Sequence, residues 1–161
     1  MEAQTMTIPT QAQTTQVYQV FIKAPAQRIW DAITRPEFTV KYFHGTSVES
    51  DFKVGSPYRS YLSDARGLAV EGEVLESDPP RRLVHTWLAH YDPELAAEDP
   101  SRVTWEIEDR EGGMCLVTVV HDQLEGAPKT AQGVNGEGWM YVLSGLKSLL
   151  ETGESLPAFT V

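Results

Sequence analysis

The chain has 161 residues, of which 41% are hydrophobic and 22% charged, a composition typical of a globular protein that forms one domain. Its formal net charge is −10 at pH 7. This negative charge disfavours binding to nucleic acid and insertion into an anionic membrane, because both require a positively charged surface. No stretch approaches about 18 continuous apolar residues, so we expect no membrane-spanning helix.

The cysteine content and the two ends of the chain suggest where the protein works. A single cysteine, Cys115, excludes an internal disulfide and favours a cytoplasmic location. We expect it to be a small buried hydrophobic side chain, because it lies in an apolar run. Residues 1–14 lack the basic and apolar regions of a signal peptide and are expected to form a flexible tail. The predicted domain spans residues 15–156, followed by a short tail over 157–161.

The chain begins with an expected strand and an expected helix. Residues 17–22 (VYQVFI) alternate in side-chain character, which predicts a strand. In the next segment Ile29, Trp30 and Ile33 recur with helical spacing. Pro25 suits the first turn of that helix.

A proline separates this helix from a second one. The residue before Pro36 is biased away from helical angles, so the first helix is expected to end there. A second short helix can begin at Pro36 and present Phe38, Tyr42 and Phe43 on one apolar face.

Beyond this point the hydrophobic period changes to two, the period of strands. Glycines and prolines separate the segments, as in the expected turns 64–67 (DARG) and 78–80 (DPP), and short connections favour antiparallel pairing. An acidic, proline-bounded loop is expected over 91–101. The predicted strands are 46–52 (TSVESDF), 58–63 (YRSYLS), 68–77 (LAVEGEVLES), 81–90 (RRLVHTWLAH), 102–109 (RVTWEIED) and 114–124 (MCLVTVVHDQL).

The last segment predicts a long helix that covers one face of the sheet. Its apolar residues step by three and four positions, and Gly153 suits the end of the helix. Polar side chains occupy the opposite side. The apolar stripe comprises Trp139, Val142, Leu143, Leu146, Leu149 and Leu150.

Three glycines, Gly133, Gly136 and Gly138, stand at the head of this helix. Glycine in a helix costs up to about 1 kcal/mol relative to alanine, so the segment is expected to open easily. One interpretation is an irregular loop before a helix that starts near Trp139. The other is a pliable lid at the mouth of a cavity, with Trp139 as a wall. The two interpretations differ in whether a cavity lies beneath Trp139.

The predicted order of strand, two short helices, six-stranded meander and long helix is the helix-grip arrangement of the α+β class. It is a curved antiparallel sheet of six to seven strands with the C-terminal helix packed across it. The chain resembles the bacterial single-domain activator-of-Hsp90-ATPase-like family of the START/polyketide cyclase/Bet v 1-like superfamily. The resemblance rests on IKAPAQRIWDAIT, FKVGSPYR, GEVLESDPPRRLVHTW, SRVTWEIED, VTVVHDQLE and GWMYVLSGLKSLLETG, in this order.

The resemblance implies a deep, mostly apolar cavity between the sheet and the helix. Members of this superfamily bind lipids, sterols, polyketides and plant hormones there, and a minority are enzymes such as cyclases. The Hsp90 co-chaperones of the family carry an additional domain, for which this chain has no room. A chaperone partner is therefore not expected, and a homodimer is left open.

Large aromatic rings are the candidate walls of this cavity, because ligand pockets are lined by apolar and aromatic side chains with a few polar groups. Ordinary core packing is the alternative for any one ring. The expected lining comprises Trp30, Phe38, Tyr42, Phe43, Tyr58, Tyr61, His85, Trp87, Trp105, His121, Trp139 and Leu143.

Two histidines, His85 and His121, share their strand faces with apolar residues. Inward histidines can orient a ligand or transfer protons near neutral pH, and the alternative is a hydrogen-bonded core residue. No pair of histidines has the spacing of metal ligands, and the chain contains no phosphate-binding or dinucleotide motif, so no metal or cofactor is expected.

These observations favour a protein that binds a small hydrophobic or aromatic molecule, with no assigned catalytic residue. The first alternative is a cyclase- or hydrolase-like enzyme that uses His85, His121, Tyr58 and Tyr61. The second is a protein-interaction role such as chaperone regulation.

Overall fold

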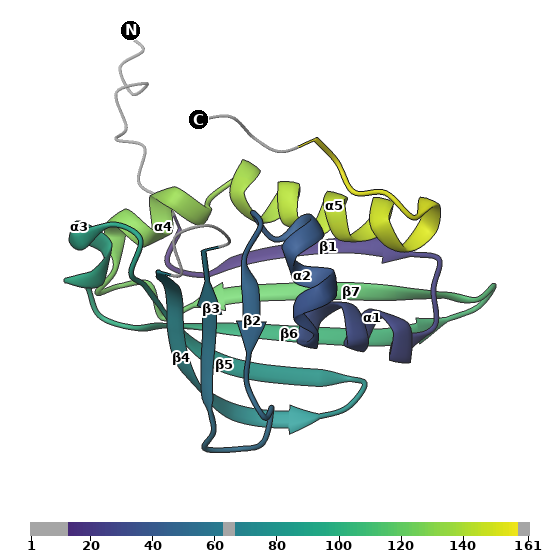
Figure 1. Cartoon of the computed structure of the whole chain (residues 1–161), viewed down its shortest axis with the longest axis horizontal. Coiled ribbons are helices and arrows are strands. Elements are labelled where there is room, and N and C mark those ends of the chain that lie inside the picture. The colour runs from purple at the N-terminus through teal and green to yellow at the C-terminus, as the bar shows by residue number, and fades with distance from the viewer. Residues whose placement is uncertain (1–12, 63–66, 158–161) are drawn as a thin grey trace, which may run out of the picture.

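Seven strands form one antiparallel sheet in the order β1–β7–β6–β5–β4–β3–β2 (Figure 1). The computed structural model describes residues 13–62 and 67–157. Most of the predicted turn at 64–67 and of the two predicted tails lies outside these residues. The strands are β1 (Gln16–Ile22), β2 (Ser47–Glu49), β3 (Pro57–Tyr61), β4 (Leu68–Asp78), β5 (Arg82–Ala89), β6 (Ser101–Arg110) and β7 (Met114–Asp122).

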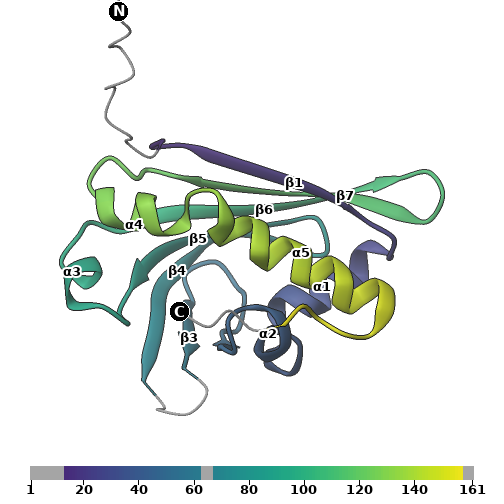
Figure 2. The ribbon, with the colours of Figure 1, turned by 90° about the horizontal axis from the view of Figure 1, so that it is seen from above.

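Five helices accompany the sheet within the described residues, and the predicted helix-grip fold is confirmed. The longest, α5, crosses one face of the sheet, and α1 and α2 lie beside it (Figure 2). No helix in the described part of the chain has the length and hydropathy needed to cross a membrane. The helices are α1 (Ala26–Thr34), α2 (Pro36–Tyr42), α3 (Pro93–Ala96), α4 (Pro128–Val134) and α5 (Glu137–Thr152).

The two helices α3 and α4 were not predicted. The first lies inside the expected acidic loop, where the Asp92 side chain accepts a hydrogen bond from the Glu94 backbone N–H. The second begins at Pro128, and its N-terminus is capped by Glu98, whose carboxylate accepts hydrogen bonds from two of its backbone N–H groups. A cap supplied from some 30 residues away leaves no local pattern in the sequence.

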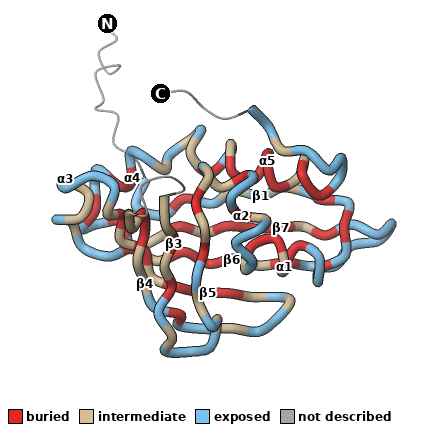
Figure 3. Tube along the Cα trace, viewed as in Figure 1, coloured by how far each residue is buried: buried red, intermediate tan, exposed pale blue. Residues whose placement is uncertain are grey.

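The apolar stripe of α5 packs on the sheet as predicted, and all six of its residues are buried (Figure 3). Gly145, on the same helix, lies so close to α2 that an added Cβ would stand 3.2 Å from the Tyr42 Cβ. Gly153 adopts a left-handed conformation with φ of 90° and ends the helix, as expected. The core therefore lies between α5, α1, α2 and the inner face of the sheet.

The sheet is curved, and β2, β3 and β4 run steeply against β6 and β7 (Figure 1). Two irregularities in register accompany this bend, one between Ser60 and Tyr61 and one between Val74 and Glu76. At Gly72 an added Cβ would lie 1.9 Å from the Thr86 backbone oxygen, so only glycine permits this approach of β4 to β5. The bend turns the β2–β4 part of the sheet to face the head of α5.

Candidate functional site

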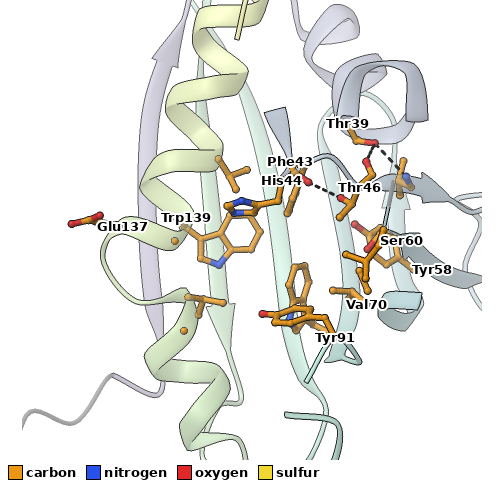
Figure 4. Close-up of a pocket in the computed structure, with 18 residues that line it drawn as sticks. Thr39, Phe43, His44, Thr46, Tyr58, Ser60, Val70, Tyr91, Glu137 and Trp139 are labelled. Atoms are coloured by element: carbon orange, nitrogen blue, oxygen red, sulfur yellow. Dashed lines mark hydrogen bonds between the residues drawn. The ribbon is translucent and has the colours of Figure 1, made fainter. Parts of the chain in front are cut away.

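A cavity of about 610 Å³ lies between the head of α5 and the bent part of the sheet (Figure 4). Its volume is in the range of small-molecule sites, roughly 300–1,000 Å³. On the helix side it is bounded by Val134, Trp139 and Val142, and on the sheet side by Tyr58 and Trp87 among others. A cavity therefore lies beneath Trp139, as the lid interpretation requires, and the opening of the segment stays a prediction.

The connection after α2 forms the third wall. Phe43 packs edge-on against Trp139, with ring centroids 5.7 Å apart, and also contacts Trp87 at 6.3 Å. Thr39 and Thr46 hold this connection in place, because the Thr39 hydroxyl donates to the Thr46 backbone oxygen at 2.8 Å. His44 stacks on Tyr141 at 5.4 Å, and burial lowers its pKa.

The predicted lining residues fall into two groups. Phe43, Tyr58, Trp87 and Trp139 line the cavity. The others lie elsewhere in the structure. They are Trp30, Phe38, Tyr42, Tyr61, His85, Trp105, His121 and Leu143.

Several residues of the second group have evident structural roles. The buried Tyr42 hydroxyl donates to the Ala32 backbone oxygen at 2.8 Å and so ties α2 to α1. Trp30 lines a separate open groove together with Phe52. Trp105 packs edge-on against Trp139 from outside the cavity, with centroids 5.7 Å apart.

Polar residues of the lining were missed by the sequence analysis. Ser60 lies on the same strand face as Tyr58, so strict alternation could have identified it. Thr46 and Tyr91 lie in connections whose course no periodic pattern reveals. Glu137 is the one Asp, Glu, Lys or Arg among the described lining, and its exposed carboxylate points away from the other labelled side chains in Figure 4. The interior therefore suits an uncharged ligand, since a buried ion without a partner is costly.

The head of α5 is tied to the sheet by two hydrogen bonds. The Trp139 indole Nε1 donates to His121 Nδ1 at 3.1 Å, and the Gly136 backbone N–H donates to the Tyr18 hydroxyl at 2.9 Å. Gly136, with φ of 62° and ψ of −108°, makes the sharp break between α4 and α5. The helix thus starts at Glu137, before Trp139, and Gly133 belongs to α4. We call residues 133–138 the hinge segment.

Substitution of Gly133 by alanine is expected to slow amide hydrogen exchange in the hinge segment. An added Cβ at Gly133 meets no atom within 4 Å, and alanine favours a helix over glycine by up to about 1 kcal/mol. The hydrogen bonds of α4 should therefore open less often, and its amides should exchange more slowly. The matched change Gly136→Ala should accelerate exchange, because a positive φ strains any residue with a Cβ. Unchanged exchange rates in Gly133→Ala would contradict a hinge controlled by helix stability.

His121 uses both ring nitrogens in the fold. Because Nδ1 accepts the Trp139 indole N–H, the proton is assigned to Nε2, which donates to the Ser101 hydroxyl at 2.7 Å. That hydroxyl donates in turn to the Trp87 backbone oxygen at 3.3 Å. Burial, with a smaller contribution from His85, lowers the pKa of His121 to about 3. These contacts indicate that His121 positions Trp139 at the head of α5.

His85 is fully buried and stacks on Tyr58, with ring centroids 3.8 Å apart and an interplanar angle of 14°. Its Nδ1 donates to the Thr86 backbone oxygen at 2.8 Å, which assigns the proton to Nδ1. Burial lowers the pKa of His85 to about 4, and burial also raises the pKa of the Tyr58 hydroxyl. Both side chains are therefore neutral at pH 7.

The described residues offer no cluster of three or more His, Cys, Asp or Glu side chains that could hold a metal ion. The lone thiol, Cys115, is buried, and its pKa is raised by burial and by Asp109. The chemistry that the cavity offers is therefore apolar contact, aromatic stacking and a few neutral hydrogen-bonding groups.

Comparison with solved structures supports the fold assignment. MLL2253 of Mesorhizobium loti is 24% identical, with 85% of this chain and 96% of that chain covered and a TM-score of 0.69. The Aha1 dimer of Colwellia psychrerythraea is 17% identical, with 89% of this chain and 100% of that chain covered and a TM-score of 0.69. PFC0360w, described as an HSP90 activator of Plasmodium falciparum, is 19% identical, with 86% of this chain and 96% of that chain covered and a TM-score of 0.68. Likenesses at these identities show the fold.

The family assignment rests on the match of the sequence to a family model. No curated protein matched the chain. The family model described as "Activator of Hsp90 ATPase homolog 1-like protein" matches residues 23–151, which is most of the chain and includes α1, nearly all of α5 and every strand except β1. The chain therefore belongs to the Activator of Hsp90 ATPase homolog 1-like family.

Proposed function

We propose that this protein binds a small, uncharged, apolar or aromatic molecule in the cavity beneath Trp139. The observation that carries the proposal is the cavity itself, about 610 Å³ in volume and walled by Phe43, Trp87 and Trp139. The lining is mainly apolar, so water inside the cavity finds few hydrogen-bond partners. An apolar ligand gains contact with the lining side chains and removes its own surface from water, at roughly 25 cal/mol per Å².

The arrangement of the rings favours a planar ligand. Phe43, Trp87 and Trp139 contact one another with centroids 5.7–6.3 Å apart and at inclined angles, so they form a concave corner. A flat aromatic ring can meet such a corner through offset-stacked and edge-on contacts, which add about 0.5–1.5 kcal/mol beyond area burial.

Filling the cavity is expected to abolish binding of a planar apolar probe. In Ser60→Phe a phenyl ring would project into the cavity from β3. We therefore expect the affinity for naphthalene to fall at least tenfold. The affinity is measured by the quenching of tryptophan fluorescence on titration with naphthalene. The matched control is Arg59→Phe, which adds the same ring to the adjacent residue on the opposite face of β3.

Thermal unfolding of both variants, measured first, would show that each is folded. Equal naphthalene affinities in the wild type and in folded Ser60→Phe would place binding outside the cavity and refute the proposal. Absence of naphthalene binding to the wild-type protein would refute it as well.

Activation of Hsp90 is the second candidate, because it appears in the description of the matched family and in the name given to one structural neighbour, the Plasmodium falciparum protein. Such an activity would act through a protein surface and would not require an open cavity. Stimulation of Hsp90 ATPase that survives Ser60→Phe would favour this candidate over ligand binding. Acid–base catalysis receives less support, because both nitrogens of His121 are engaged in the fold.

A further inference from the structure

We infer that the ligand carries a neutral carbonyl oxygen that accepts a hydrogen bond from the Ser60 hydroxyl on the sheet-side wall of the cavity. This inference rests on the proposed function and specifies the polar chemistry of the same site. It goes beyond an apolar cavity, because it fixes one functional group of the ligand and the wall against which that group lies.

The first observation is the position of Ser60 in the middle of the cavity wall. Its cross-strand neighbours are Val48 on β2 and Val70 on β4, and both of them line the cavity. Along the chain, Tyr58 and Leu62 line it as well. Lining residues therefore flank Ser60 both across the strands and along β3, so its side chain leaves the sheet toward the cavity.

The second observation is that the Ser60 hydroxyl has no partner and is not sealed in the core. Ser60 is buried, with 6% of its surface exposed, and its hydroxyl makes no hydrogen bond in the described structure. The wholly enclosed polar side-chain atoms that lack a partner, among the residues described, are His85 Nε2, Trp87 Nε1 and His90 Nε2. The Ser60 oxygen is not one of them, so it keeps accessible surface, and the flanking residues direct that surface into the cavity.

The threonine hydroxyls of the same lining are engaged in the fold. The Thr39 hydroxyl donates to the Thr46 backbone oxygen at 2.8 Å, and the Thr46 hydroxyl donates to the Phe43 backbone oxygen at 2.7 Å. The Ser60 proton has no such acceptor within the described part of the chain. A ligand that fills the cavity excludes water from this hydroxyl, and a buried donor without an acceptor is costly, so the ligand must then supply the acceptor.

A neutral carbonyl group meets this requirement best. It accepts the Ser60 proton and brings no proton of its own, whereas a ligand hydroxyl or amide N–H would need a second acceptor. A carboxylate would meet no buried counter-charge, since the exposed Glu137 is the one Asp, Glu, Lys or Arg in the described lining. Figure 4 shows Ser60 across the cavity from Trp139. The ligand class is therefore a planar aromatic or polycyclic ketone, with its oxygen toward β3 and its ring toward the head of α5.

Two probes of matched shape test this inference. The first is 2-acetylnaphthalene, and the second is 2-isopropenylnaphthalene, in which a methylene group replaces the carbonyl oxygen. Their affinities are measured by the quenching of tryptophan fluorescence in the wild type and in Ser60→Ala, which removes only the hydroxyl. One neutral hydrogen bond changes affinity by roughly two- to tenfold, so the ratio of ketone to alkene affinity should fall by about that factor in the variant.

Two control variants and a second readout separate the hydrogen bond from a change in shape. Ser60→Thr keeps the hydroxyl and should preserve the affinity ratio. Ser47→Ala removes a serine hydroxyl on β2 outside the cavity and should preserve it too. A hydrogen bond lowers the stretching frequency of a carbonyl group, which isotopic labelling of the carbonyl carbon isolates in the infrared spectrum of the complex. This frequency should rise from the wild type to Ser60→Ala, and a merely structural role of Ser60 would not move it.

The outcomes distinguish this inference from the function on which it rests. An affinity ratio and a carbonyl frequency that are the same in the wild type and in folded Ser60→Ala would overturn the hydrogen bond and leave apolar binding standing. Failure of both probes to bind the wild type would overturn both ideas. A larger loss of affinity in Ser60→Ala for the alcohol 1-(2-naphthyl)ethanol than for the ketone would overturn the choice of a carbonyl.

Discussion

Replacement of Leu146 by alanine is expected to lower the free energy of unfolding by about 2–5 kcal/mol. Leu146 is fully buried in the middle of the α5 stripe and belongs to the main hydrophobic core. Truncation removes apolar contact with the sheet and leaves a void, since both α5 and the strands are held by neighbouring contacts and cannot collapse into it. Urea titration of the wild type and the variant gives the difference directly.

The matched control for this change is Met140→Ala on the same helix. Met140 is 49% exposed on the outer side of α5, so its truncation should change stability by less than about 1 kcal/mol. A loss below about 1 kcal/mol for Leu146→Ala would contradict the central role of α5 in covering the sheet. An equal, large loss in both variants would mean that the buried face of α5 contributes no more to stability than its outer face, because alanine has a higher helix propensity than leucine or methionine and the loss could not come from propensity.

The regular elements could be predicted because their signals are local. The alternation of β6 places Val103, Trp105 and Ile107 inward, and all three are buried. The three- and four-residue spacing of the last helix likewise identified its buried stripe. In both cases the residues that define the pattern are also those that pack on the core, so periodicity and burial carry the same information.

The cavity could be predicted only in part, because its position depends on long-range geometry. The bend of the sheet requires Gly72 beside Thr86 and the irregular register near Ser60, and neither has a distinctive sequence signature. Aromatic residues were therefore assigned to the cavity by type alone. Trp87 and Trp139 do line it, whereas Trp105 packs outside it.

The hydrogen-bond partners of buried polar atoms could not have been foreseen at all. The sequence placed His85 and Trp87 on one strand face, which the structure confirms. Whether a buried polar atom finds a partner depends on distances of a few tenths of an ångström between elements distant in sequence. His121 finds Trp139 and Ser101, and His85 Nε2 finds no partner in the described structure.

Acidification from pH 7 to pH 5 is expected to destabilise the protein by about 4 kcal/mol through its two buried histidines. Burial lowers the pKa from 6.5 to about 4 for His85 and to about 3 for His121. Below about pH 6.5 the unfolded chain therefore binds protons that the folded protein does not. Each histidine then costs about 1.4 kcal/mol per pH unit, and the loss continues until the pH approaches the pKa of the folded protein.

The pH window separates the histidines from the carboxylates. Glu76, Glu98 and Glu151 have pKa values lowered below 4.5 by hydrogen bonds with their neighbours, so their stabilising contributions are lost only below that pH. Burial also lowers the pKa of His44, so its contribution has the same sign in this window and is removed with His44→Gln as the background. In that background, urea titrations at half-unit steps between pH 7 and pH 5 should report mainly on His85 and His121. Single substitutions of these two by glutamine should each remove about half of the remaining slope, and the double variant should remove most of it. A wild-type stability that stays constant between pH 7 and pH 5 would mean that both rings can be protonated within the folded protein. The assignment of His121 as a neutral acceptor for the Trp139 indole, and with it the hydrogen bond that ties the head of α5 to the sheet, would then be wrong.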